Sequence, residues 1–87
     1  MKIKEGFVLR KVGKDQVVVA IGPAAAALNG LIKLNASGVL LWKALEQGAD
    51  QKALADALVR EYGISRQQAE ADAAAFLKPL QKIGCVE

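Results

Sequence analysis

Very few side chains in this sequence could perform covalent or metal chemistry. The chain of 87 residues contains no histidine and a single cysteine, Cys85. Without histidine, the common zinc sites, the Ser-His-Asp triad and the Cys-His pair are excluded, and one thiol cannot form an internal disulfide. Cys85 is therefore expected to fill a small apolar space or to lie incidentally at the surface. We expect no catalytic residue, no metal site and no cofactor, so the composition favours a binding protein over an enzyme.

The charged residues are distributed unevenly along the chain. Residues 1–34 contain six basic and two acidic side chains, a net charge of +4, whereas residues 35–87 contain six basic and seven acidic side chains, a net charge of −1. The positive excess has two interpretations. It is either a solvated sheet face or an attraction for an acidic partner, which would mainly raise the association rate.

The length and hydrophobicity of the chain fit one small domain. A chain this short buries only roughly 60–65% of its unfolded surface, which leaves room for one modest core. Its longest apolar runs, such as Ala24 to Leu28 and Val39 to Trp42, are far shorter than the ~20 residues of a membrane-spanning helix. No basic and then apolar leader opens the sequence. We therefore expect a single domain over residues 1–87, located in the cytoplasm.

Residues 1–34 are expected to form a three-stranded sheet. Residues 7–12 and 16–21 read as strands, and the turn residues 13–15 between them are too few for anything but an antiparallel hairpin. Gly22-Pro23 ends the second strand, residues 24–28 form either one helical turn or an irregular loop, and Asn29-Gly30 is a turn signal. Leu31 to Leu34 follows as a third strand at an edge, where its free backbone groups are normally a liability.

The remaining residues, 35–87, are expected to form a three-helix bundle. Asn35 is a favoured N-cap for a first helix that runs to about Gln47, and Asp50 is placed to cap a second helix that Gly63 ends. Ser65 begins a third helix and forms a capping-box pattern with Gln68.

Two further features of the helices carry expectations. Pro79 should bend the third helix or fray its last turn, because it removes one amide and crowds the carbonyl of Ala75. The large pieces of the core are expected to be Trp42, Tyr62, Phe76 and Phe7.

This order of elements predicts an α+β fold similar to a winged helix-turn-helix with its sheet placed first. Such a shape serves both DNA-binding and peptide-binding proteins. Arg66, Gln67 and Gln68 would suit a DNA recognition helix, but Glu70 and Asp72 follow them within one turn and would repel phosphates. A winged-helix DNA-binding protein is therefore kept only as the alternative.

Three groups of residues resemble the PqqD-like family of peptide-recognition elements. They are Gly6-Phe7-Val8-Leu9-Arg10; Leu34-Asn35-Ala36-Ser37-Gly38 followed by Leu41-Trp42-Lys43-Ala44-Leu45; and Leu54, Leu58, Tyr62-Gly63-Ile64 and Phe76-Leu77 with Leu80. The string L-N-x-S/T-G-x-x-L/I-W is the most specific part, and Ser37 stands where many members have threonine. The resemblance covers nearly the whole chain.

The resemblance implies a non-catalytic peptide chaperone of natural product biosynthesis, a RiPP recognition element. Such a protein binds the leader segment of a ribosomally synthesised precursor peptide and presents it to a modifying enzyme, often a radical S-adenosylmethionine (radical SAM) enzyme. The leader is held as a strand added to the third strand of the sheet. The chain looks more like the generic members than the branch that makes pyrroloquinoline quinone. A docking subunit that mainly binds the modifying enzyme and contacts the peptide weakly is a second alternative, which the sequence does not separate from a peptide chaperone.

On this resemblance, the peptide-binding residues lie on the third strand and the third helix. Leu31, Ile32, Lys33 and Leu34 would form the pairing edge, Gln68, Ala71, Asp72 and Ala75 the wall of a groove, and Phe76 its floor. Each has a simpler interpretation: Leu34 and Phe76 as core, the alanines as helix formers, and Asp72 as a solvated charge. The free edge could also pair with a second copy of the chain to give a homodimer.

Overall fold

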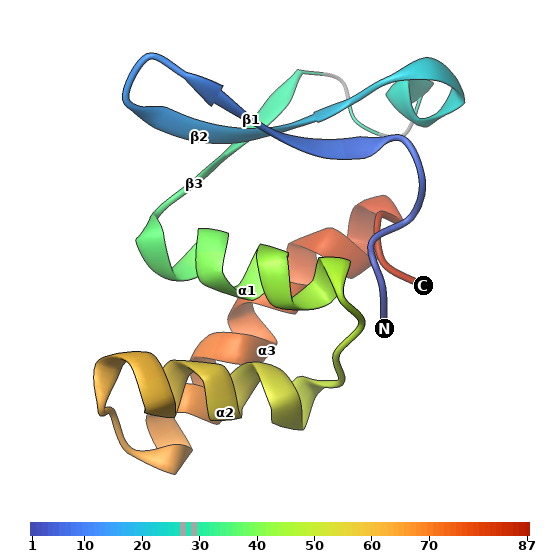
Figure 1. Ribbon diagram of the computed structural model, residues 1–87. Helices are drawn as coiled ribbons and strands as arrows, with labels where there is room; N and C mark the ends of the chain where they lie inside the picture. Colours follow the sequence, from blue (N-terminus) through green and yellow to red (C-terminus); the bar gives the residue numbers. More distant parts are fainter. Residues whose placement is uncertain (27, 29) are drawn as a thin grey trace.

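The computed structural model describes residues 1–26, 28 and 30–87. In chain order the elements are β1 (Phe7–Val12), β2 (Asp15–Ala20), η1 (Gly22–Ala26), β3 (Leu31–Leu34), α1 (Ala36–Glu46), α2 (Gln51–Tyr62) and α3 (Arg66–Ile83). Figure 1 shows the sheet as one layer, with the three helices on one side of it. The predicted α+β class, a three-stranded antiparallel sheet followed by three helices, is confirmed.

The sheet has the order β1-β2-β3, and both pairs are antiparallel. Val12 pairs with Asp15, so the hairpin turn consists of Gly13 and Lys14 alone, and Gly13 takes a φ of +62° that a two-residue turn favours. Asp15, expected in the turn, is the first residue of β2. The expectation that both faces of the second strand are at least partly covered agrees with Val17 and Val18, which point to opposite faces and are both buried.

The connection between β2 and β3 contains a short 3₁₀ helix, η1. This observation favours the helical turn over the irregular loop. The expected turn at Asn29-Gly30 is only partly described, because Asn29 lies outside the described residues.

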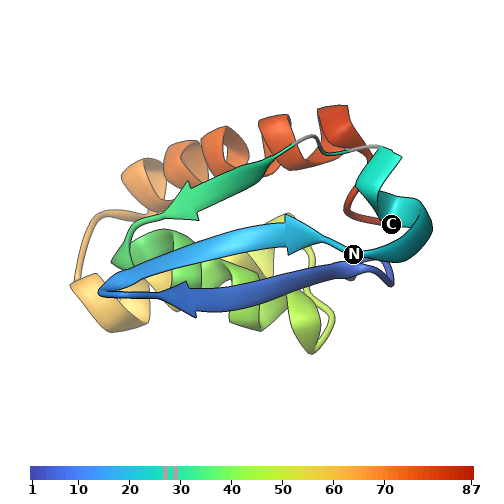
Figure 2. The same cartoon turned by 90° about the horizontal axis from the view of Figure 1, so that it is seen from above.

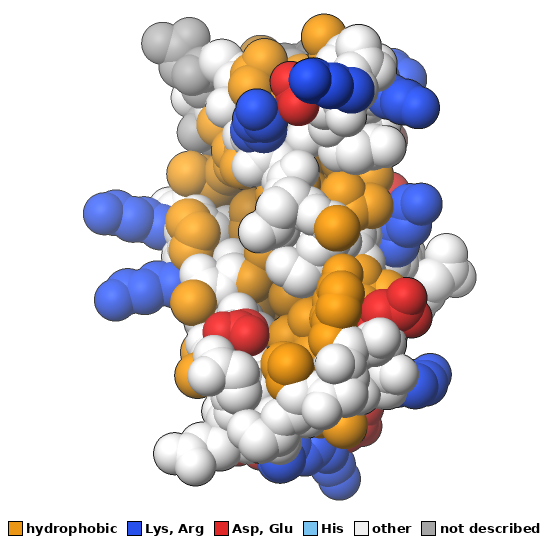
Figure 3. Space-filling view, turned by 90° about the vertical axis from the view of Figure 1, so that its left-hand side faces the viewer, with side chains coloured by type: hydrophobic (Ala, Val, Ile, Leu, Met, Phe, Trp, Pro, Cys, Tyr) orange, Lys and Arg blue, Asp and Glu red, His pale blue; other side chains and the backbone are white. Residues whose placement is uncertain are grey.

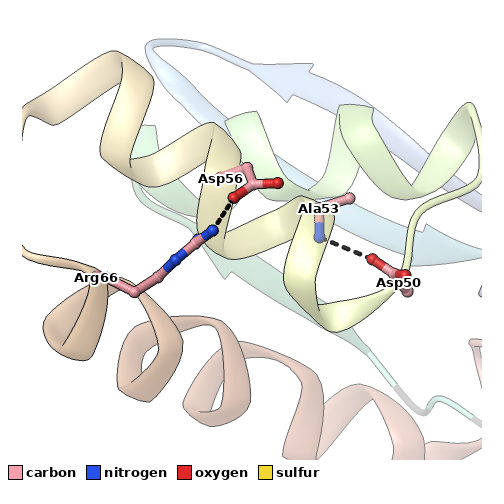
Figure 4. A network of polar contacts seen from close by, with 4 residues as sticks. All are labelled: Asp50, Ala53, Asp56 and Arg66. Carbon is pink, nitrogen blue, oxygen red and sulfur yellow. Dashed lines mark hydrogen bonds and ion pairs between the residues drawn. The ribbon is translucent and has the colours of Figure 1, made fainter.

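Each α-helix begins at the side-chain cap that its sequence predicts. Asn35 Oδ1 accepts from the amide of Gly38 at 2.8 Å, and Asp50 Oδ1 accepts from the amide of Ala53 at 2.7 Å (Figure 4). Ser65 Oγ accepts from the amide of Gln68 at 3.1 Å. In a complete capping box the Gln68 side chain would bond back to the backbone amide of Ser65. Here the Gln68 side-chain amide instead donates to Asp72 Oδ1 at 2.7 Å.

The third helix continues through Pro79 to Ile83. Its end is closed by two backbone hydrogen bonds, from Gly84 N to Gln81 O and from Cys85 N to Leu80 O, each 3.1 Å long. The expected fraying of the last turn is therefore wrong, because these bonds satisfy terminal carbonyls of the helix, whereas the expected bend near Pro79 stays a prediction.

The core lies between the sheet and the helices and between the helices themselves. Trp42, Leu45 and Leu54 are fully buried, and the Trp42 indole nitrogen donates to Glu46 Oε2 at 3.2 Å. Trp42 and Phe7 are core residues as predicted, whereas Phe76 is partly buried. Tyr62 is 46% exposed, so its assignment to the core is wrong. It occupies the last turn of α2, where the side chain borders a hollow of the surface.

The two ends of the chain pair with each other, as Figures 1 and 2 both show. Ile3 and Val86 form an antiparallel bridge, flanked by two 2.9 Å hydrogen bonds between the backbones of Lys2 and Glu87. The backbone of Lys4 donates to the Cys85 carbonyl, also at 2.9 Å. Cys85 is fully buried beneath this pairing, which confirms it as a core filler. Burial raises the pKa of its thiol and keeps it protonated.

No helix in the described part of the chain combines the length and the hydrophobicity that crossing a membrane requires.

Candidate functional site

The outer edge of β3 is open. Its other edge pairs with β2 from Gln16↔Leu34 to Val19↔Leu31. Within residues 1–26, 28 and 30–87, no backbone hydrogen bond from another segment reaches the outer edge. A row of main-chain donors and acceptors is therefore free to pair with an added strand.

An apolar groove runs beside this edge. Figure 2 shows β3 lying alongside α3, and the hollow between them holds about 470 Å³. It is lined by residues of β3, of the start of α1 and of α3: Ile32, Lys33, Leu34, Asn35, Gly38, Phe76, Pro79 and Leu80. Because Lys33 is the one charged residue among them, the groove suits apolar side chains.

Two further hollows extend the groove past the end of β3. The first is lined by Asn35, Ser37, Gly38, Leu41, Leu58, Asp72, Ala75 and Phe76, and the second by Asn35, Ala36, Ser37, Leu58, Tyr62, Ile64 and Asp72. Asn35 borders all three hollows, so they form one path from the β3 edge to the end of α2. Figure 3 shows hydrophobic side chains gathered along this side of the molecule, between the sheet and the helices. We call the three hollows together the groove.

The structure brings most of the predicted binding residues together. Ile32, Lys33, Leu34 and Phe76 line the hollow beside β3, and Asp72, Ala75 and Phe76 line the next one. Three predicted residues do not line the groove. Leu31 alternates with Ile32 and points to the other face of the sheet, where it is 57% exposed. Gln68 and Ala71 are exposed on α3.

Several groove residues were not predicted from the sequence. From α3 these are Pro79 and Leu80, three and four residues after Phe76, and this spacing on one helix face could have identified them. At the start of α1 they are Gly38 and the N-cap residue Asn35, which was predicted only as a cap. The other unpredicted groove residues come from α1, from α2 and from the connection after α2: Ala36, Ser37, Leu41, Leu58, Tyr62 and Ile64. No local sequence pattern indicates that these three segments lie close together.

The groove has few charged side chains, and their contacts with the rest of the protein are exposed to solvent. Lys33 Nζ lies 3.4 Å from Asp15 Oδ1, and these side chains are 67% and 44% exposed. An ion pair this exposed contributes little to stability, so Lys33 is free to exchange Asp15 for another carboxylate. Asp72 accepts from Gln68 at the other end of the groove. Within the described residues, no group of histidine, cysteine, aspartate and glutamate side chains is placed to hold a metal ion.

Two of the three candidate DNA-reading residues bond to side chains of the protein itself. Arg66 forms an ion pair with Asp56 of α2 (Figure 4), and the Gln68 side chain donates to Asp72. A recognition helix needs such side chains free to reach base edges. The arrangement therefore favours the groove over the start of α3 as the functional surface.

Known proteins share both the sequence pattern and the fold of this chain. The family described as "Coenzyme PQQ synthesis protein D (PqqD)" matches residues 15–86. The solved structure "TbiB1 in Complex with the TbiA(beta) Leader Peptide" is 26% identical, with a TM-score of 0.79, over 100% of this chain and 95% of that one. "Lasso peptide synthetase B1 complexed with the leader peptide" is 23% identical, with a TM-score of 0.74, over 95% and 92%, and shares the fold. No curated protein matches significantly.

Proposed function

Because this chain belongs to the PqqD family, as its sequence motifs predicted, we propose that it is a non-catalytic chaperone for a ribosomally synthesised precursor peptide. It binds the leader segment of that peptide and presents the remainder to a modifying enzyme. The similar protein TbiB1 was solved in complex with a leader peptide, which supports this class of ligand. One observation of this chain carries the proposal: an unpaired strand edge lies directly beside an apolar groove.

The leader binds as a fourth strand along the outer edge of β3. Backbone hydrogen bonds to the main chain of Leu31 to Leu34 supply the pairing, and they are insensitive to the leader's sequence. Leu31 takes part through its backbone, because its side chain points to the opposite face of the sheet.

Selectivity comes from the side chains that the leader places in the groove. Successive residues of a strand point to opposite faces, so every second leader side chain enters between β3 and α3. Phe76, Pro79 and Leu80 offer apolar contact there, and Asp72 and Ala75 border the continuation. Gln68 and Ala71 complete the proposed set on the exposed side of α3, where Gln68 orients the Asp72 carboxylate.

The partner that receives the peptide is a modifying enzyme, of the radical SAM type according to the family resemblance. The resemblance alone supports that choice of enzyme. A ribosomally made peptide is available in the cytoplasm, and the proposal places the protein there.

An amide-resolved NMR titration tests the proposal. The labelled protein is titrated with the leader half of the short peptide encoded nearest to its gene, and with a generic DNA duplex as the control. We expect the peptide to shift the amides of residues 31–34 and of the α3 residues from Gln68 to Leu80. If the peptide leaves them unmoved and the duplex instead shifts Lys52 and Arg66, the DNA-binding alternative replaces the proposal.

A set of leader peptides, each N-methylated at one backbone position, tests strand addition itself. A methyl group removes one amide donor and leaves the side chain intact. Only every second amide of an added strand faces its neighbour, so strand addition predicts that binding is lost at alternate positions. Equal losses of binding at successive positions would contradict strand addition. The leader would then bind through its side chains alone.

A further inference from the structure

One face of the sheet has no helix packed on it in the described part of the chain. Figure 1 shows all three helices on the other side, and Figure 2 looks onto the uncovered face with the strands in front. The strand register places on this face the residues that alternate with the core positions: Val8, Arg10, Val12, Asp15, Val17, Val19, Leu31 and Lys33. Ile21, whose amide donates to the Gly6 carbonyl at 2.7 Å, continues the same alternation. We call this set the outer sheet face.

The outer sheet face is apolar across all three strands. Four large hydrophobic side chains are markedly exposed in the described part of the chain, and three lie here: Val12 at 58%, Ile21 at 49% and Leu31 at 57%. Val8, Val19 and Leu31 form one row across the strands by their register. This row, with Ile21 directly after β2, is an exposed apolar patch of the kind that marks an interaction surface, and Val12 is a separate exposed position at the hairpin end.

The charges around the patch indicate the kind of partner. Arg10 and Lys33 flank Val17 in the next row of the sheet, and Lys14 lies in the hairpin turn. The carboxylate of this face, Asp15, is already paired with Lys33. Two copies of the chain facing each other here would bring cations together, which costs free energy, whereas a surface rimmed by Asp and Glu would complement them.

We propose that the outer sheet face docks the modifying enzyme through an apolar surface rimmed by carboxylates. This inference rests on the proposed function and adds the surface that the enzyme uses. Along β3, Ile32 and Leu34 line the groove and Leu31 lies on the outer face, while Lys33 borders both surfaces. The leader and the enzyme therefore occupy different surfaces of the same strand and bind at the same time.

Two substitutions on β1, away from the leader edge, test the docking surface. Val12→Glu places a carboxylate on the outer sheet face at a position that is already exposed, and Arg10→Glu reverses a charge beside the patch. Lys52→Glu, on the exposed surface of α2, is the control with the same charge change as Arg10→Glu. Each full-length variant is titrated calorimetrically with the purified peptide-modifying enzyme encoded beside the gene, and separately with the leader peptide.

We expect both β1 variants to weaken enzyme binding tenfold or more, with leader affinity within twofold of the wild type, and Lys52→Glu to change neither. Wild-type enzyme affinity in both β1 variants, with leader binding intact, would overturn the docking proposal alone. Failure of the wild-type protein to bind the leader would overturn the proposed function instead.

Two other occupants of the outer sheet face are distinguished by separate measurements. Sedimentation that shows a wild-type dimer and a Val12→Glu monomer would overturn the proposal in favour of self-association. The wild type is also tested with vesicles of anionic phospholipid. If it binds them, and Val12→Glu abolishes this binding but leaves enzyme binding unchanged, the proposal would be overturned in favour of a membrane surface.

Discussion

Pro79 follows Ala75 by four residues within α3, and so the Ala75 carbonyl lacks the main-chain N–H that a helix normally supplies to it. Both residues border the groove: Pro79 lines the hollow beside β3, and Ala75 lines the next one. The helix therefore gives up one internal hydrogen bond at the wall that the proposed leader contacts. A helix selected for stability alone would carry a different residue at this position.

Replacing Pro79 with alanine should separate stability from binding. We expect Pro79→Ala to raise the free energy of unfolding by about 1–3 kcal/mol, because alanine restores the amide and has a much better helix propensity. The same change removes the ring from the groove wall and should weaken leader binding several-fold. Urea unfolding and calorimetric titration measure the two effects. Lys78→Ala, at the neighbouring exposed position, is the control, and its free energy of unfolding should stay within about 0.5 kcal/mol of the wild type. A Pro79→Ala variant less stable than the wild type would contradict a stability cost of Pro79.

A methyl group at Gly38 should narrow the groove where its first two hollows meet. A Cβ at this buried glycine would lie 3.1 Å from Asn35 Oδ1 and 3.4 Å from the Cβ of Leu34. The better helix propensity of alanine, about 1 kcal/mol, offsets this crowding, so we expect Gly38→Ala to change stability by less than about 1 kcal/mol. Leader affinity should nevertheless fall at least fivefold, as fluorescence anisotropy with a labelled leader would measure.

Gly63→Ala is the matched control for Gly38→Ala. Gly63 has a φ of +64° at the end of α2, so alanine there is strained, but nothing lies within 4 Å of the added Cβ and the residue does not line the groove. We expect it to lower the melting temperature and to leave leader affinity unchanged. Equal loss of affinity in both variants would mean that binding follows stability rather than the shape of the groove.

The cap at the strand-to-helix junction predicts a loss of stability. Asn35 Oδ1 accepts from the amide of Gly38 and from the hydroxyl of Ser37, at 2.8 and 3.0 Å. Asn35→Ala should therefore lower the free energy of unfolding by about 1 kcal/mol. Asn35→Asp keeps an acceptor oxygen and should retain most of that stability in the same denaturation experiment. If the aspartate variant were as unstable as the alanine variant, capping would not be the role of Asn35.

The features predicted correctly from the sequence are those that local interactions determine. The bounds of β3 and the caps of all three helices follow from a change of hydrophobic period and from side chains that bond within three residues. The hairpin follows from a connection too short to cross over. Ile32, Leu34 and Phe76 were placed at the groove by the family resemblance, and all three line the hollow beside β3.

The features that the sequence did not reveal depend on contacts between distant segments. Ile3 and Val86 are 83 positions apart and form a single bridge, too short to produce any periodicity. Tyr62 continues the apolar spacing of α2, yet it lies where the helix ends at the surface. Gln68 fits a capping box, but its side chain bonds instead to Asp72, four residues later, which is an equally local alternative.

Burial of Cys85 predicts how stability changes in alkaline solution. Because burial raises the thiol pKa in the folded protein, the folded state holds this proton at a pH where the unfolded chain, with a thiol pKa of about 8.5, releases it. The stability associated with this group is therefore fully present below pH ~8.5 and is lost as the pH rises toward the folded pKa, at up to ~1.4 kcal/mol per pH unit.

Chemical unfolding of the wild type and of Cys85→Ala between pH 7.5 and 10.5 measures this loss, which should appear only in the wild type. The alanine variant controls for every effect of alkaline pH that does not involve the thiol. An aromatic disulfide reagent provides a second readout, since the thiol should react only when the pairing of Ile3 with Val86 opens. Deleting residues 1–4 should therefore speed the reaction severalfold or more. Rapid labelling of the intact folded protein, or parallel pH profiles for the two proteins, would contradict the burial of Cys85.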